Sequence, residues 1–140
     1  MAGKKTEKPT IIVAEDDKDD QEILVMAFKR VTDSHHLKLV DNGKDLVELL
    51  GALSDHELPC LIVLDYNMPH LNGKETLKLL RSKKRYDHIP KIIFTTSNSG
   101  REKADCISIG ARDFMIKPTD IEDIVGSARK MLGYCDNNIN

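Results

Sequence analysis

Four consecutive apolar residues, Leu61 to Leu64, end at the carboxylate of Asp65, and a turn containing Pro69 follows. A continuous apolar run of this length is typical of a strand that is buried on both faces, as in a parallel sheet. Asp65 would then lie at the carboxyl end of the strand, where open α/β sheets bind their ligands. A single aspartate at such a place more often only caps the next turn, so the rest of the chain has to decide its role.

Further strands and helices alternate along the chain. Short β-branched or apolar runs predict strands at Thr10–Ala14, Leu37–Val40, Lys91–Thr95 and Asp113–Lys117. Apolar residues at helical spacing predict five helices, whose apolar faces lie within residues 24–31, 46–53, 73–80, 102–109 and 121–132. We expect Asp19 or Asp20 to cap the first helix and Gly110 to end the fourth. This alternation predicts an α/β fold with parallel strands, right-handed crossovers and helices on both faces of the sheet.

Charge and hydropathy exclude some classes of function. The 140 residues include 21 basic and 23 acidic side chains, so the formal net charge of −2 gives no argument for binding nucleic acid or a membrane. No apolar run approaches the ~18 residues that a membrane span needs. We expect residues 1–8 to be a disordered lead-in, residues 9–135 to form one domain and residues 136–140 to be a short tail.

Three cysteines, Cys60, Cys106 and Cys135, lie far apart and have neither metal-ligand nor redox-motif spacing. We therefore expect reduced thiols in a cytoplasmic protein. Cys60, next to a buried strand, is then expected to act as a small hydrophobic residue.

Polar side chains follow several of the predicted strands at the point where each strand ends. They are Glu15, Asp16, Asp17, Asp65, Thr95 and Lys117. Parallel strands bring these positions to one edge of the sheet, where two carboxylates ~4 Å apart repel by about 4 kcal/mol at an effective dielectric constant near 20. Oxygen ligands of this kind suit Mg²⁺. A carboxylate can also attack phosphorus, and an ammonium and a hydroxyl group can then neutralise and bind the phosphoryl group.

Each of these residues also has a simpler explanation. The acidic residues could be a solvated helix cap, Thr95 an ordinary strand residue, and Lys117 part of a surface turn before Pro118. The functional interpretation is favoured because the acidic cluster, Asp65, Thr95 and Lys117 lie at the carboxyl ends of different strands of the same predicted sheet.

At these positions the chain resembles the receiver domain of two-component response regulators, over roughly Pro9 to Leu132. The resemblance is carried by Ile11-Ile12-Val13-Ala14-Glu15-Asp16-Asp17, Leu64-Asp65-Tyr66-Asn67-Met68-Pro69, Asn72-Gly73, Phe94-Thr95-Thr96-Ser97, Gly110-Ala111 and Phe114-Met115-Ile116-Lys117-Pro118. It implies a flavodoxin-like, doubly wound sheet of five parallel strands in the order 2-1-3-4-5, with five helices.

The resemblance also implies a role for each site residue. Asp65 would accept the phosphoryl group, and Mg²⁺ would be held by Glu15, Asp16, Asp65 and the backbone carbonyl of Asn67. Lys117, with a cis bond to Pro118, would contact the phosphoryl group, and Thr95 and Phe114 would be the switch pair. Thr95 lies 30 residues after Asp65, and Lys117 22 residues after Thr95, as in the family, which favours Thr95 over Thr96 as the phosphate-facing hydroxyl.

Three features of the chain depart from the common pattern of the family. The first acidic position is Glu15, whose longer side chain could reach the metal differently. Thr96, beside the hydroxyl, occupies a position that is often Ala or Gly, and could affect donor access or phosphoryl lifetime. The segment from Ser54 to Pro59 is longer than in the shortest receivers, which resembles stand-alone receivers paired with bacterial phytochrome kinases.

The expected function is a switch rather than an enzyme. A histidine kinase or phosphotransfer protein would supply the phosphoryl group, and a downstream protein would bind the surface of about Asn98 to Leu132, the fourth helix, fifth strand and fifth helix. The sequence leaves open whether the chain forms a homodimer through the fifth helix. The alternatives are a phosphatase of the haloacid dehalogenase type, which needs an aspartate where this chain has Asn67, and a pseudo-receiver, which usually lacks the acceptor, metal or lysine residues.

Overall fold

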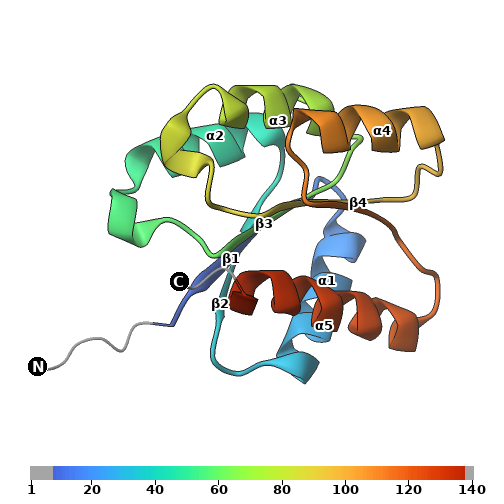
Figure 1. Cartoon of the computed structure of the whole chain (residues 1–140). Helices are drawn as coiled ribbons and strands as arrows, with labels where there is room; N and C mark the ends of the chain where they lie inside the picture. Colours follow the sequence, from blue (N-terminus) through green and yellow to red (C-terminus); the bar gives the residue numbers. More distant parts are fainter. Residues whose placement is uncertain (1–7, 138–140) are drawn as a thin grey trace, which may run out of the picture.

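Five parallel strands form one sheet in the order β2-β1-β3-β4-β5 in the computed structural model, which describes residues 8–137 (Figure 1). The strands are β1 (Thr10–Ala14), β2 (His36–Val40), β3 (Leu61–Leu64), β4 (Lys91–Thr95) and β5 (Asp113–Ile116). The predicted fold and strand order are confirmed. The expected lead-in at residues 1–8 falls outside the described residues except for Lys8, and so do the last three residues of the expected tail.

Helices cover both faces of this sheet (Figure 1). They are α1 (Lys18–Val31), α2 (Gly43–Ala52), α3 (Gly73–Arg81), α4 (Gly100–Ile109) and α5 (Ile121–Asn137). Two short 3-10 helices, Asp55–Glu57 and Lys84–Tyr86, precede β3 and β4 and carry no apolar periodicity that predicts them. None of the helices within residues 8–137 is long and apolar enough to cross a membrane.

Alternate residues of the central strands face opposite layers of the core. Ile12, Ile62 and Leu64 pack with the apolar faces of α2 and α3, and Ile11 and Val63 pack with those of α1 and α5. Because β3 is buried on both faces, all four of its residues are apolar. The edge strand β2 is only partly buried, which explains its weaker sequence signal.

Helix ends agree with the prediction in part. Gly110 ends α4 at a φ of 118°, a left-handed conformation that glycine adopts without strain. The prediction for the start of α1 was wrong, because Asp17 is the N-cap and its side chain accepts a hydrogen bond from the Asp20 backbone N–H. Helix α5 extends to Asn137, two residues beyond the predicted end of the domain, and β5 ends at Ile116 rather than Lys117.

Two local predictions were wrong. The peptide bond before Pro118 is trans, since the described residues contain no cis peptide bond. Trans remains the cheaper isomer even before proline, by about 0.5–1 kcal/mol. Cys60 and Cys135 are joined by a disulfide rather than being reduced thiols, with their Cα atoms 5.0 Å apart. Packing of α5 on the sheet brings together two cysteines that are 75 residues apart, and no local spacing reveals that.

The start of α3 lies unusually close to the turn after Asp65. The Asn72 side chain caps α3, and the Gly73 backbone N–H donates to the Tyr66 carbonyl at 2.7 Å. A Cβ atom on Gly73 would lie 2.9 Å from the Asp65 carbonyl oxygen and 2.9 Å from the Tyr66 Cα. Glycine is therefore required where this helix meets the turn that carries Asp65.

We expect Gly73→Ala to lower the free energy of unfolding by about 1–3 kcal/mol, because backbone atoms must move to admit the methyl group. Gly51→Ala is the matched control: apart from its chain neighbours and the backbone of its own helix, no atom lies within 4 Å of a Cβ at this position, so the change should raise stability by about 0.5–1 kcal/mol. Urea unfolding of both variants measures the difference. Equal effects in the two variants would contradict the close approach at Gly73.

Candidate functional site

Backbone hydrogen bonds continue the sheet beyond the ends of its strands and bring the candidate residues together. The Glu15 N–H donates to Val40, the Asp65 N–H to Ala14, and the Lys117 N–H to Thr95 at 2.7 Å. Each polar residue is thus held one position past its strand, at the same edge of the sheet. The convergence predicted from the sequence is confirmed for Glu15, Asp65 and Lys117.

The ammonium group of Lys117 lies among three carboxylates. Its Nζ atom is 2.6 Å from Glu15 Oε1, 2.8 Å from Asp20 Oδ2 and 2.9 Å from Asp65 Oδ2. The side chains of Lys117 and Asp65 are each only 10% exposed, and that of Glu15 is 2% exposed. Charges with so little solvent around them need this mutual neutralisation.

Burial sets the protonation state of Glu15. It raises the pKa of Glu15 to about 7, and the negative charge of Asp65 adds to the rise, although hydrogen bonds from Lys117 and the Asp17 N–H oppose it. Burial acts to lower the pKa of Lys117, but hydrogen bonds to Asp20, Glu15 and Asp65 outweigh it, so its pKa is raised. Lys117 therefore stays charged while Glu15 can exchange a proton near neutral pH.

Three carboxylates of the site could share one cation. Oxygen atoms of Glu15, Asp16 and Asp65 all lie within 4.8 Å of one another. Glu15 and Asp65 are buried, whereas Asp16 is exposed and faces solvent. Asn67 follows in the same turn, and its backbone N–H donates to Asp65 Oδ1 at 3.2 Å. The set fits a hard divalent cation, which prefers oxygen ligands and keeps some of its waters.

Thr95 and Phe114 lie on the neighbouring strands β4 and β5. Thr95 is fully buried, and its hydroxyl oxygen accepts a hydrogen bond from the Ser97 N–H at 3.3 Å. Phe114 is 6% exposed, lies opposite Ile93 in the sheet and belongs to the core layer beneath α4. The ring predicted to be a switch is thus packed inside the protein, next to the strand that carries Thr95.

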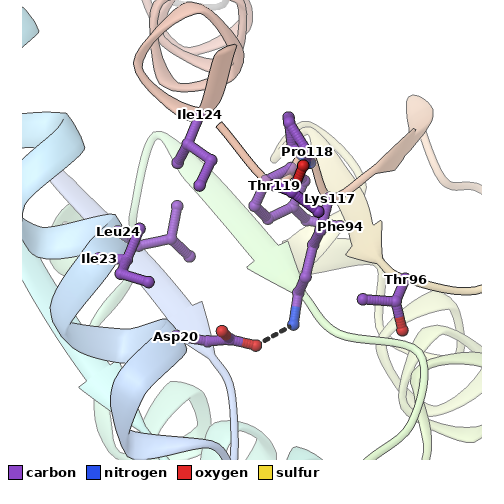
Figure 2. A pocket seen from close by; sticks show the side chains of 9 residues that line it. All are labelled: Asp20, Ile23, Leu24, Phe94, Thr96, Lys117, Pro118, Thr119 and Ile124. Atoms are coloured by element: carbon purple, nitrogen blue, oxygen red, sulfur yellow. Dashed lines mark hydrogen bonds and ion pairs between the residues drawn. The ribbon is translucent and has the colours of Figure 1, made fainter. Parts of the chain in front are cut away.

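Asp20 is a site residue that the sequence did not reveal. It lies in the first turn of α1, where an acidic residue is expected as a helix-terminal charge, yet its carboxylate contacts Lys117. A hollow of about 310 Å³ borders this contact and is lined mainly by α1, the end of β4 and the segment that joins β5 to α5. Figure 2 shows Lys117 reaching toward Asp20, with Thr96 on the opposite rim. Thr96 is exposed, so it lies beside the site without filling it.

Comparison with known proteins identifies the family. A sequence model of the response regulator receiver domain matches residues 11–129. The chain belongs to this family. It is 28% identical to the two-component response regulator ORR5 of Oryza sativa subsp. japonica over 116 residues. This alignment covers 83% of this chain and 83% of ORR5.

Solved receiver structures agree in fold. Response regulator RPA3017, from red light signaling of R. palustris, is 30% identical to this chain, covers 94% of it and 96% of its own length, and gives a TM-score of 0.82. The Mn²⁺-bound form of response regulator Rcp1 is 23% identical, covers 87% of this chain and 90% of its own, and gives a TM-score of 0.77. Because Rcp1 is only 23% identical to this chain, its similarity shows only that the two proteins share a fold.

We expect Lys117→Met to lower the free energy of unfolding by about 3 kcal/mol at pH 8, measured in EDTA, because Glu15 and Asp65 lose their buried counter-charge. The loss should shrink toward pH 5. The folded-state pKa of Glu15 already lies above its ordinary value of 4.5, and removing Lys117 raises it further. A carboxyl group with a raised pKa destabilises the fold only when ionised, so protonation at low pH removes that part of the penalty.

The matched control is Lys38→Met, which removes an exposed lysine from β2 and should change stability little at any pH. A loss in Lys117→Met that is small, or constant from pH 5 to pH 8, would contradict the electrostatic account of the site.

Proposed function

We propose that this receiver domain accepts a phosphoryl group on Asp65 from a phosphohistidine of a sensor kinase or phosphotransfer protein, with Mg²⁺ as the cofactor. The contact of Lys117 with Asp65, 2.9 Å between Nζ and Oδ2, is the observation that carries the proposal. It supplies a positive charge where negative charge builds up during phosphoryl transfer.

Asp65 is suited to attack phosphorus. One of its oxygens accepts from the Asn67 N–H and the other from Lys117, which fixes the orientation of the carboxylate. In the transfer, an Asp65 oxygen forms the new O–P bond while the P–N bond to the donor imidazole breaks and the imidazole leaves. Thr95, at the end of the next strand, would donate a hydrogen bond from its hydroxyl group to a phosphoryl oxygen.

Glu15, Asp16 and Asp65, with the Asn67 carbonyl, would hold Mg²⁺. The family and the oxygen ligands within 4.8 Å of one another support a divalent cation here. When bound, Mg²⁺ neutralises phosphoryl oxygens in this kind of chemistry. Glu15 binds in its ionised form, so cation binding releases the proton that Glu15 holds part of the time near pH 7.

The alternatives fit less well. Membership of the receiver family argues against a haloacid dehalogenase phosphatase, and Asn67 stands where that mechanism needs a second aspartate. A pseudo-receiver is disfavoured because Asp65, Lys117 and the acidic residues Glu15 and Asp16 are all present and lie close together at one edge of the sheet. We therefore propose a signalling switch in the cytoplasm, not an enzyme with a separate substrate.

A downstream protein would bind the surface formed by α4, β5 and α5. Thr95 and Phe114 lie next to this surface, and three large apolar side chains on it are about 40% exposed: Ile107, Ile116 and Ile121. Exposed apolar residues of this kind favour protein contact. The alternative partner for this surface is a second copy of the chain, which would give a homodimer.

The test is incubation with acetyl phosphate and measurement of the intact mass. The wild-type protein should gain one phosphoryl group in the presence of Mg²⁺ and none in EDTA, and Asp65→Asn should gain none. Asp19→Asn is the matched control, since this exposed carboxylate of α1 makes no contact with Lys117, and it should label like the wild type.

Labelling that persists in Asp65→Asn, or that is equally fast in EDTA, would contradict the proposal. Amide NMR shifts of the labelled protein test the output surface in the same sample. They should change across α4, β5 and α5, and changes confined to the neighbours of Asp65 would exclude that surface.

A further inference from the structure

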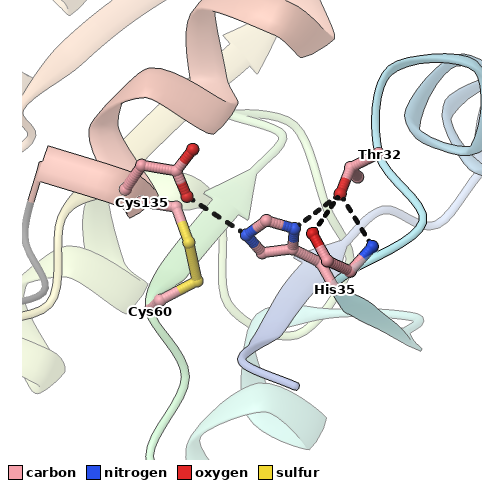
Figure 3. Close-up of a disulfide and its surroundings, with 6 residues drawn as sticks. Thr32, His35, Cys60 and Cys135 are labelled. Atoms are coloured by element: carbon pink, nitrogen blue, oxygen red, sulfur yellow. Dashed lines mark hydrogen bonds and ion pairs between the residues drawn. A yellow bond between two sulfur atoms is a disulfide. The ribbon is translucent and has the colours of Figure 1, made fainter.

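A second cluster of reactive side chains lies at the opposite edge of the sheet from Asp65. Cys60 directly precedes β3, and its backbone N–H donates to the Thr10 carbonyl at the start of β1. Its disulfide partner Cys135 lies near the end of α5 (Figure 3). Cys135 is fully buried, whereas Cys60 is partly exposed. The phosphorylation chemistry proposed above makes no use of this pair.

His35 lies against the disulfide and is held firmly. Its Nδ1 atom is 2.7 Å from the Thr32 hydroxyl, and its Nε2 atom is 3.2 Å from Asp136 Oδ1. The His35 side chain is only 8% exposed. A ring nitrogen of His35 and both sulfur atoms lie within 4.8 Å of one another (Figure 3). This is the arrangement in which an imidazolium stabilises a thiolate.

Other ionisable groups lie near the cluster. The hollow that Cys60 borders is also lined by Lys8, His56, Glu57 and His88. The Lys8 ammonium donates to the Asp33 carbonyl, and Asp136, the partner of His35, is exposed at its position in α5. His35 belongs to the cluster with the two sulfur atoms, whereas His56 lines only the hollow.

We propose that Cys60 and Cys135 form a reversible dithiol–disulfide site that is activated by His35. The proposal draws on the cytoplasmic location proposed above, because disulfides in that compartment are usually transient and redox-active. It does not depend on phosphorylation of Asp65. The partner it requires is a dithiol reductant in one direction and a disulfide oxidant in the other.

In the reductive direction, a thiolate of the dithiol attacks the sulfur of Cys60, which is the more exposed residue of the pair. A mixed disulfide forms at Cys60, the bond between the cysteine sulfurs breaks, and Cys135 leaves as a thiolate beside His35, which can give it a proton. The second thiol of the reductant then attacks the reductant's other sulfur, which is bonded to Cys60 in the mixed disulfide. The bond to Cys60 breaks, and Cys60 is released as a thiol. Two electrons and two protons pass to the protein, and the reductant becomes a disulfide.

Reduction would loosen the end of α5. The disulfide is the covalent link between the end of this helix and the segment that enters β3, and α5 forms part of the proposed output surface. The site would therefore let the thiol redox state of its surroundings act on a helix that also takes part in signalling.

The first experiment is a redox titration of the wild-type protein in mixtures of reduced and oxidised dithiothreitol, with EDTA present because Cys60, Cys135 and His35 could together bind a metal. Free thiols are trapped with N-ethylmaleimide and assigned by peptide mass. We expect Cys60 and Cys135 to convert together and reversibly while circular dichroism shows the protein still folded. Cys106 is buried, and burial raises its pKa to about 11, so it should stay unlabelled throughout.

The second experiment measures the pH dependence of iodoacetamide alkylation of the reduced protein. The faster of the two thiols should titrate at least one unit below the ordinary cysteine pKa of about 8.5. His35→Gln should remove that shift and slow alkylation at pH 7 by about tenfold. His56→Gln, the matched control in the neighbouring hollow, should leave the profile unchanged.

Three results would overturn the proposal: thiols that titrate at the ordinary pKa, equal profiles in the two histidine variants, or a disulfide that is reduced only when the wild-type protein unfolds. Because the titration and the pH profile of the wild type need no variant, they decide the matter even if His35→Gln fails to fold. Neither readout involves Asp65, so failure of acetyl phosphate labelling would leave the proposal intact, and failure here would leave the proposed function intact.

Discussion

The ammonium group of Lys117 is the charge on which the carboxyl edge of the sheet depends. It lies within 2.9 Å of oxygen atoms from Glu15, Asp20 and Asp65, three carboxylates supplied by the β1–α1 region and the end of β3. Without a positive charge among them, the buried pair Glu15 and Asp65 could not both stay ionised at low cost. Burial is the main cause of the raised pKa of Glu15, and the negative charge of Asp65 adds to it even with Lys117 in place. A divalent cation among these carboxylates would favour their ionised forms.

The rest of the fold serves to hold this arrangement in place. Strand β3 is buried on both faces, so Asp65 is fixed at the end of a rigid element, and Gly73 lets α3 begin directly against the turn that follows it. Lys117 reaches the site because its N–H continues the pairing of β5 with β4. The same strands carry Thr95 and Phe114, through which we propose that a change at Asp65 passes to the surface of α4, β5 and α5. The disulfide fixes α5 at the other edge of the sheet, well away from this chemistry.

Much of this could be predicted from the sequence because it depends on local pattern. Apolar runs and helical spacing predicted the elements, and the residue after each strand predicted Glu15, Asp65 and Lys117 at one edge. What could not be predicted depends on three-dimensional packing. Asp20 looks like a helix-terminal charge until α1 is placed beside Lys117. The Cys60–Cys135 pair appears only when α5 is packed on the sheet, and its isolated cysteines therefore suggested reduced thiols. The resemblance to receivers carried over a cis bond before Pro118 that this chain does not have.

The most direct test of the account identifies the carboxylate that carries the phosphoryl group. Protein treated with acetyl phosphate and Mg²⁺ is reduced with borohydride, which converts an acyl phosphate of aspartate to homoserine, and the peptides are then sequenced by mass spectrometry. We expect homoserine at position 65 and unmodified residues at positions 15, 16 and 20. Homoserine at position 16 or 20 with Asp65 intact, or a reduced Glu15, would contradict it.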